Sequence, residues 1–191
     1  MRGSSICEIK GGPGLSSFSS NAADLAEIRQ VLAKYARGVD RLDKDLLMEC
    51  YWPDGADDHG AISGTPQEFV DWVVSTITAE FSSTSHVILQ SVVDIQGSRA
   101  WGESYWQARS SLKSSSEVRL STGRYEDLFE RRDGEWRILV RELVFDWDHV
   151  VQVKPFRTRN SPSQDASRVG RMDREDPSYR FRLRHGFSDR E

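Results

Sequence analysis

The segment "GRYEDLFERRDGEWRILVRELVFDW" (residues 123–147) contains two long runs rich in β-branched and aromatic residues, one on each side of Asp133-Gly134. An Asp-Gly pair between two such runs is typical of a β-hairpin, because the tight turn needs backbone angles that Asp and Gly accept. The segment therefore predicts two long antiparallel strands.

Two further runs of the same character come earlier in the chain. They are "SHVILQSVVDI" (residues 85–95) and "RAWGESYWQARSSL" (residues 99–112), and the "QGS" between them predicts another hairpin turn. The strand that leads into the Asp-Gly turn begins before the opening segment, with "VRLSTGRYEDLFER" (residues 118–131). The second half of the chain is therefore expected to form a meander of long antiparallel strands.

The first half of the chain has the spacing of helices instead. From Asp24 onward, apolar residues recur every three or four positions, which is the period of one helix face. These residues are Leu25, Ile28, Leu32, Tyr35 and Val39. Gly38 is expected to mark the end of this helix.

Two shorter helices are expected after the first. Asp43 is placed as the N-cap of "KDLLMECYW" (residues 44–52), and the proline that follows ends this helix. The segment "TPQEFVDWVVSTITAEF" (residues 65–81) begins with Thr65 as N-cap, and Glu68 completes a capping box.

Three helices followed by antiparallel strands predict an α+β fold in which a curved sheet wraps against helices. The length of 191 residues suits one such domain, which we assign to residues 21–153. The Gly/Ser-rich residues 1–20 are expected to be disordered, and their first residues, "MRGS", to be tag-derived. Residues 154–191 form a basic tail with ten Lys/Arg against six Asp/Glu. Its segment "DREDPSYRFRLRHGF" (residues 173–187) is too aromatic for a linker, so we expect a lid over a pocket mouth.

Composition excludes several classes of protein. The net charge of −4 argues against nucleic-acid binding. No apolar run is long enough for a membrane span, and the N-terminus lacks the apolar core of a signal peptide. Cys7 and Cys50 do not make a disulfide framework. We therefore expect a cytoplasmic protein that binds neither nucleic acid nor membrane.

The last predicted strand carries apolar residues on both faces. Strict alternation places Trp136, Ile138, Val140 and Val144 on one face, and Leu139, Arg141, Leu143, Phe145 and Trp147 on the other. A strand that is apolar on both sides is covered on both. One face can meet the helices and a pocket, and the other predicts a homo-oligomer.

His86 is the main candidate for acid–base chemistry. It begins the first long strand, on the face predicted to carry Gln90 and Val92. A lone histidine on an apolar face is more often a core residue. In a cone of helices and sheet, however, the end of the first helix can lie at the same mouth. Asp40 would then fix the imidazole tautomer, and Tyr35 would be placed to donate a proton.

Arg141 is a charged residue in an apolar strand. It is expected either to pair structurally with Asp40, Glu126 or Glu103, or to hold substrate oxygens in a pocket. The residues alone favour neither possibility.

The segment "DDHG" (residues 57–60) raises the question of a metal site. Adjacent residues of a strand point to opposite faces, and no second histidine lies at ligand spacing from His59. A polar surface turn is therefore favoured, and no metal site is expected.

Three blocks of the chain resemble a known family. "YARGVDRLDKDLLMECYWPDG" (residues 35–55), "TSHVILQ" (residues 84–90) and the opening segment are similar to the SnoaL-like branch of the nuclear transport factor 2-like superfamily. The resemblance spans about residues 24–153. It is strongest to the dehydratase and dehydrochlorinase group, with hexachlorocyclohexane dehydrochlorinase, bile acid 7α-dehydratase and scytalone dehydratase. It implies a cone-shaped α+β barrel, three N-terminal helices on a mostly antiparallel sheet, and a homotrimer.

The resemblance also implies a site. In that group an Asp–His dyad carries the elimination, and Asp40 and His86 match its two positions. Tyr35 matches a position held by tyrosine or lysine, and Arg141 matches an arginine of the last strand. The acidic residue that the bile acid enzyme contributes from its second long strand has no clear counterpart; Tyr105 and Trp106 stand nearby.

The expected function is the elimination of water or hydrogen halide, without a cofactor, from a small apolar substrate of alicyclic, terpenoid, steroid or polyketide type. His86 removes a proton, and Tyr35 or Arg141 stabilises the leaving group. The expected substrate-binding residues are Trp52, Phe69, Trp72, Ile77, Phe81, Tyr105, Tyr125 and Phe145. Isomerisation or aldol cyclisation by the same dyad and noncatalytic binding of a small molecule are the alternatives.

Overall fold

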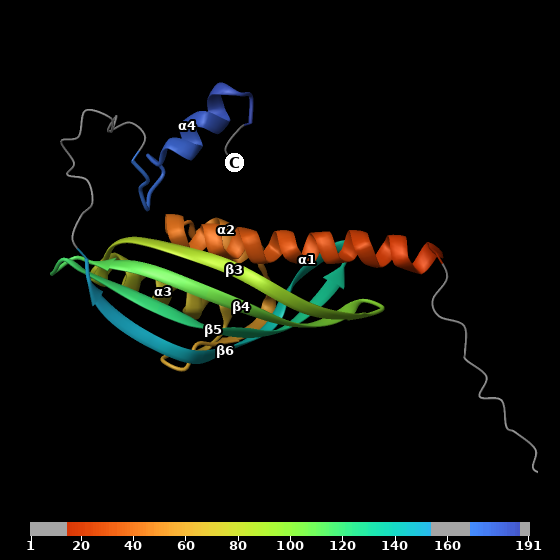
Figure 1. The fold of residues 1–191 in the computed structure, drawn as a ribbon. Helices are drawn as coiled ribbons and strands as arrows, with labels where there is room; N and C mark the ends of the chain where they lie inside the picture. The colour runs from red at the N-terminus through yellow and green to blue at the C-terminus, as the bar shows by residue number, and fades with distance from the viewer. Residues whose placement is uncertain (1–14, 154–168, 188–191) are drawn as a thin grey trace, which may run out of the picture.

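A computed structural model describes residues 15–153 and 169–187 of the chain (Figure 1). Residues 1–14, 154–168 and 188–191 lie outside the described residues, and with them Cys7 and most of the predicted N-terminal tail.

Helix α1 (Leu15–Arg41) begins earlier and ends later than its apolar period predicted. It continues past Gly38 to Arg41, and Leu42 then takes a left-handed backbone conformation, with φ of 52°. Gly38 is needed for packing instead, because a Cβ there would lie 2.8 Å from Leu47 Cγ. Asp40 therefore lies in the last turn of α1 rather than beyond it.

Helix α2 (Lys44–Glu49) has the predicted N-cap, since Asp43 Oδ1 accepts a hydrogen bond of 3.2 Å from the Leu46 backbone N–H. The helix ends before Tyr51, where strand β1 (Tyr51–Asp58) begins. The prediction of a helix through Trp52 was wrong because pairing of Tyr51 with Ile138 of the last strand overrides the local helix signal.

Helix α3 (Pro66–Glu80) confirms its sequence signals. The Thr65 side chain accepts from the Glu68 backbone N–H, and the Glu68 carboxylate accepts from Thr65 at 2.8 Å, which completes the capping box. Residues Phe69, Val70, Val73 and Ile77 form its buried face.

The sheet contains β1, β2 (Ser63–Gly64), β3 (Phe81–Gln96), β4 (Arg99–Leu112), β5 (Glu117–Arg132) and β6 (Glu135–Gln152). Its order is β2-β1-β6-β5-β4-β3, and every pair is antiparallel except β1 with β6. The Asp133-Gly134 turn has positive φ at both residues, 52° and 88°, as a tight hairpin requires. The predicted α+β fold, with three N-terminal helices on a curved, mostly antiparallel sheet, is confirmed (Figure 1).

A β-bulge in β6 changes which residues share a face. Phe129 pairs with Ile138, but Leu128 pairs with Val140, so Leu139 is an extra residue in the strand. From this point Arg141 follows Ile138 onto the inner face. A second bulge lies at Asp146, because Gly123 pairs with Phe145 but Thr122 pairs with Trp147, so Trp147 returns to the outer face. The strict alternation predicted for this strand was therefore wrong, because each inserted residue exchanges the two faces.

A similar irregularity lies in β3, between Ile88 and Ser91. His86 pairs with Ala108, which is buried on the inner face. Alternation had predicted that Val92 shares the face of His86. Val92 is 60% exposed, however, so the two side chains lie on opposite faces. In both strands a bulge decides which side chains reach the interior.

The inner face of the sheet packs against α1 and α3, and Ile28, Leu32 and Phe69 of these helices are fully or almost fully buried. The outer face carries exposed apolar side chains, among them Trp101 at 47% and Trp147 at 43%. The second apolar face expected for the last strand is therefore present, and no other element among the described residues covers Trp147.

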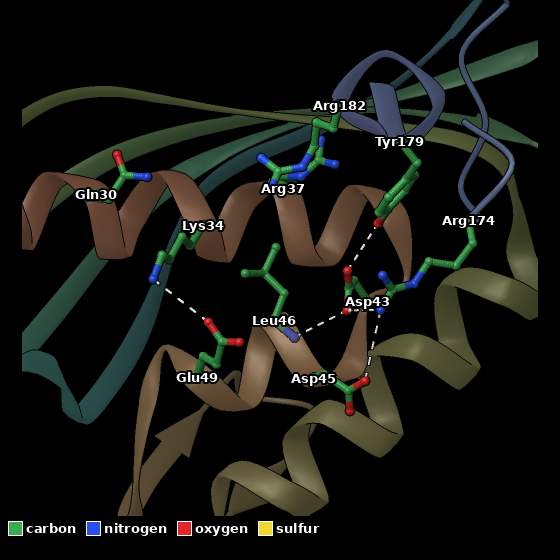
Figure 2. Close-up of a pocket in the computed structure, with 10 residues that line it drawn as sticks. All are labelled: Gln30, Lys34, Arg37, Asp43, Asp45, Leu46, Glu49, Arg174, Tyr179 and Arg182. Atoms are coloured by element: carbon green, nitrogen blue, oxygen red, sulfur yellow. Dashed lines mark hydrogen bonds and ion pairs between the residues drawn. The ribbon is translucent and has the colours of Figure 1, made fainter. Parts of the chain in front are cut away.

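The C-terminal segment packs on the helices, on the side of α1 and α2 away from the sheet (Figure 1). Helix α4 (Pro177–Arg184) places Tyr179 against this surface, where Tyr179 is 4% exposed and donates a hydrogen bond of 3.0 Å to Asp43 Oδ2. Figure 2 shows Tyr179 pointing from α4 toward Asp43, with Arg174 beside the same carboxylate. Asp43 thus caps α2 and anchors the tail.

The anchoring of the tail should depend on pH through Asp176. Burial by itself raises the pKa of Asp176, but hydrogen bonds from Ser178 and from the Arg171 backbone lower it to about 2. The folded state therefore prefers the charged carboxylate. This contributes on the order of 2 kcal/mol that is fully present above an unfolded pKa of about 3.9 and is lost as pH falls toward 2.

We expect hydrogen exchange of the α4 amides to accelerate between pH 4 and pH 2 relative to the amides of β4 and β5. Asp176→Asn should already exchange fast at pH 7 and should change little with pH. Equal pH dependence of α4 in both proteins would contradict this assignment.

Candidate active site

A cavity of about 160 Å³ lies between α1, α3 and the inner face of the sheet. Its apolar wall includes Val39, Trp72, Val73, Ile77, Phe81, Trp106, Leu143 and Phe145. Polar side chains that reach it include Tyr35, His59, His86, Thr84, Ser110, Ser121, Arg119 and Glu80. A mostly apolar wall with a few convergent polar groups is the usual form of a small-molecule site.

The structure brings Asp40 and His86 together, as the sequence predicted. Nδ1 of His86 lies 2.7 Å from Asp40 Oδ1, and the His86 backbone N–H donates to both oxygens of the carboxylate, at 3.0 and 2.9 Å. Asp40 therefore fixes the backbone and the ring of the same residue. The ring nitrogen that remains, Nε2, has no partner among the described residues and belongs to a side chain that lines the cavity.

A second histidine reaches the same cavity, which sequence reasoning missed. His59 Nδ1 contacts Asp57 Oδ1, and Nε2 lies 3.2 Å from the Tyr35 hydroxyl. The His59 side chain is only 10% exposed, and its ring stacks on Phe69 at 4.4 Å between centroids. The prediction of a polar surface turn was therefore wrong.

The signal that could have found His59 is its spacing from Asp57. Residues i and i+2 of an extended segment lie on the same face, so an inward Asp57 brings His59 inward too. Asp57 is 1% exposed, and its Oδ2 accepts a hydrogen bond of 2.6 Å from the Tyr51 hydroxyl.

Arg141 does not line the cavity. It is fully buried and forms a bidentate ion pair with Asp127, with distances of 2.7 and 2.8 Å. Its guanidinium lies between the rings of Tyr35 and Tyr125, 4.2 and 3.9 Å from their centroids. The partner is thus none of the three carboxylates considered from the sequence, and the guanidinium lies behind the tyrosines rather than in the cavity lining.

The tyrosines of the cavity stay protonated. Burial raises the pKa of Tyr35 well above its ordinary value, and Tyr125 and Asp57 act in the same direction, whereas Arg141 opposes them. Burial also raises the pKa of Tyr125, with Arg141 as the largest opposing effect. For Arg141 itself, burial alone lowers the pKa, but attraction to Asp127 holds it above its ordinary value.

Of the residues expected to bind a substrate, five line the cavity: Trp72, Ile77, Phe81, Tyr125 and Phe145. Phe69 lies behind the wall, stacked on Tyr35 and His59. Trp52 is elsewhere, because its indole N–H donates to the Glu130 carbonyl, and Arg132 and Arg137 cover its ring.

Tyr105 was also assigned wrongly, because β4 alternates in burial. Ser104 and Trp106 are its buried neighbours, so Tyr105 points to the outer face. Trp106 is the residue that lines the cavity, where its ring stacks on Tyr125 at 5.7 Å. The sequence analysis correctly expected an aromatic residue of β4 at the cavity wall, but it assigned Tyr105 instead of Trp106.

Within residues 15–153 and 169–187, no group of three or more His, Cys, Asp or Glu side chains is arranged to hold a metal ion. In the same residues, no helix is long and apolar enough to cross a membrane.

A family model for the SnoaL-like domain matches residues 20–142. The chain belongs to the SnoaL-like family. This match covers the three helices and all but the last part of the sheet, and it confirms the resemblance expected from the sequence. No curated protein matches the chain.

Several solved structures share this fold. A hexachlorocyclohexane dehydrochlorinase from Novosphingobium barchaimii superposes with a TM-score of 0.67 at 17% identity, over 74% of this chain and 99% of its own. A provisionally named scytalone dehydratase from Novosphingobium aromaticivorans gives 0.64 at 18%, over 78% and 99%. A protein from Kribbella flavida gives 0.62 at 21%, over 68% and 95%. At these identities the likeness shows the SnoaL-like fold alone.

Removing one partner of the buried ion pair should destabilise this SnoaL-like domain strongly. Asp127→Asn leaves the Arg141 charge buried and uncompensated, which typically costs about 3–5 kcal/mol. We expect urea unfolding to show a loss of this size. Asp54→Asn, which breaks the exposed pair with Arg132, should change stability little. Similar unfolding midpoints for the two variants would show that the buried pair is dispensable.

Proposed function

We propose that the protein is a cofactor-independent lyase that eliminates water or hydrogen halide from a small apolar substrate. The observation that carries the proposal is the Asp40–His86 pair, whose histidine lines a mostly apolar cavity. The dehydrochlorinase and the dehydratase among the structural neighbours share its fold, which adds support by analogy only.

His86 acts as the general base. With Asp40 accepting from Nδ1–H, the neutral ring presents Nε2 as an acceptor, and the carboxylate stabilises the imidazolium that forms when Nε2 takes a proton. The base removes a proton from the carbon next to the one that carries the leaving group, and a double bond forms as that group departs. General base catalysis of this kind contributes roughly 10²–10⁴-fold in rate.

Tyr35 lines the cavity next to His59. Its raised pKa keeps the hydroxyl protonated, so it is a hydrogen-bond donor and not a base. Arg141, which the sequence suggested as a second group on the substrate, holds the rings of Tyr35 and Tyr125 instead. It is a positioning residue in this proposal.

The volume of the cavity limits the size of the substrate. About 160 Å³ is close to the roughly 150 Å³ of an engineered cavity that binds benzene. Alicyclic or monoterpene-sized compounds with one ring therefore fit better than steroids or extended polyketides.

The first experiment is mass spectrometry of hydroxylated and halogenated compounds of this size, incubated with the wild type and with His86→Ala. We expect loss of water or acid with the wild type and at least a 100-fold slower reaction with His86→Ala. His185→Ala, which changes an exposed histidine of the tail, is the matched control and should keep wild-type activity.

The outcomes separate three activities. Full turnover by His86→Ala would refute the mechanism. A product of unchanged mass would identify an isomerase or aldol cyclase that uses the same dyad. Saturable binding without any product would identify a noncatalytic binding protein.

We also propose that the protein forms a homo-oligomer, with a trimer favoured, through the outer face of the sheet. Exposed Trp101 and Trp147 support it, because large apolar side chains gathered on one face mark interaction sites. Sedimentation velocity should show an oligomer at micromolar concentration and a monomer for Trp147→Glu. A monomeric wild type would exclude this interface.

The proposed lid role of the tail applies to its first described residues. Gly170, Arg171 and Met172 line a hollow together with Asp40 and Thr84, beside the catalytic pair. Helix α4 covers α1 and α2 instead. If these residues close the site, Asp176→Asn should lower activity along with the protection of the tail.

A further inference from the structure

The histidines of two Asp–His pairs line the cavity, and the proposed elimination uses only one pair. Asp57 and His59 approach it from β1 and the turn after it, and Asp40 and His86 from α1 and β3. We propose that Asp57, His59 and Tyr35 form a proton-donating relay for the leaving group, so that the substrate is an alcohol that loses water. This inference rests on the proposed lyase function and specifies its substrate class.

The geometry of His59 fits a relay. One ring nitrogen contacts the Asp57 carboxylate and the other lies 3.2 Å from the Tyr35 hydroxyl, so the imidazole bridges a carboxylate and a phenol. Tyr51 donates to the second oxygen of Asp57 and fixes the carboxylate. Stacking on Phe69 holds the plane of the ring. Each atom of the relay therefore has a defined partner.

Asp57 is the carboxylate in direct contact with the His59 ring. The other ionisable groups shown to contact or interact with this ring are Tyr35 from α1 and Tyr125 and Asp127 from β5. Helix α3 packs the rings of Phe69 and Trp72 against His59, and its last residue, Glu80, lines the same cavity. Asp127 and Arg141 neutralise each other in their ion pair. Asp57 is therefore the negative charge that remains next to the ring.

The proton transfers balance as follows. His86 Nε2 takes the proton from the substrate carbon, and the electrons of that C–H bond form the double bond. The C–O bond breaks with its electron pair going to oxygen, which receives the hydroxyl proton of Tyr35 and leaves as water. His59 Nε2 returns a proton to Tyr35. Exchange with solvent then removes the proton from His86 and restores the one on His59.

The relay discriminates between leaving groups. A chloride leaves as a stable anion and needs no proton, whereas hydroxide is a poor leaving group until it is protonated. A proton donor in the same cavity as the base therefore indicates a secondary or tertiary alcohol whose neighbouring carbon carries an acidic hydrogen. Only such a substrate uses all five side chains.

The test compares two ring compounds that differ only in hydroxyl or chloride on the same carbon, incubated with the full chain. We expect His59→Gln and Tyr35→Phe to slow water elimination by roughly 100-fold or more, but to slow chloride elimination by less than about threefold. His86→Ala should lose both reactions. His185→Gln, which makes the same substitution as His59→Gln at an exposed position, should keep both. Circular dichroism and urea unfolding identify any variant that fails to fold, and His59→Asn then replaces His59→Gln.

Equal losses of both reactions in His59→Gln would overturn the relay and leave His59 a structural residue. Retention of both reactions in His86→Ala would instead overturn the proposed function.

A second measurement needs no substrate. Nitrogen NMR of the histidine rings in the full chain should show an Nε2 signal of His59 that moves in Tyr35→Phe, because this nitrogen lies 3.2 Å from the Tyr35 hydroxyl. An Nε2 signal of His59 that does not move in Tyr35→Phe would overturn the relay, whatever compound is turned over.

Discussion

The ion pair between Arg141 and Asp127 organises the interior of this domain. Both side chains are fully or almost fully buried, so each charge needs the other, and the bidentate contact fixes β5 against β6 in one register. The guanidinium then holds Tyr35 and Tyr125 through their ring faces. Tyr35 in turn lies next to His59. The Arg141–Asp127 ion pair, which does not line the cavity, therefore positions polar groups that do.

Three aspartates near the cavity show how the same side chain serves different purposes. Asp127 neutralises a buried cation. Asp40 accepts from a backbone N–H and from the ring of His86, which ties the end of α1 to the start of β3. Asp57 holds His59 and is itself held by Tyr51. Each carboxylate is satisfied by specific donors, as burial of a charge demands, and each therefore orients a neighbour that can do chemistry.

Much of the framework could be predicted from local signals. The capping box at Thr65, the Asp133-Gly134 turn and the period of α1 depend on neighbouring residues only, and the structure confirms them. The pairing of Asp40 with His86 was expected from the family resemblance and from a cone fold that can bring the end of the first helix to the start of the first long strand, and the structure shows the contact. Which side chains of β3 and β6 face the interior could not be predicted. A β-bulge depends on pairing with the neighbouring strand, and it reverses the alternation of faces beyond it.

The sequence by itself determined the α+β class, the three helices and the long antiparallel strands, because hydrophobic period, caps and turns depend on residues that are close together in the chain. The tertiary structure alone decided that Arg141 is buried on Asp127, that Trp106 rather than Tyr105 faces the cavity, and that His59 joins His86 there. Those outcomes depend on which backbone groups pair across the sheet and on which charges find partners in the interior. Both are set by contacts between residues far apart in the chain.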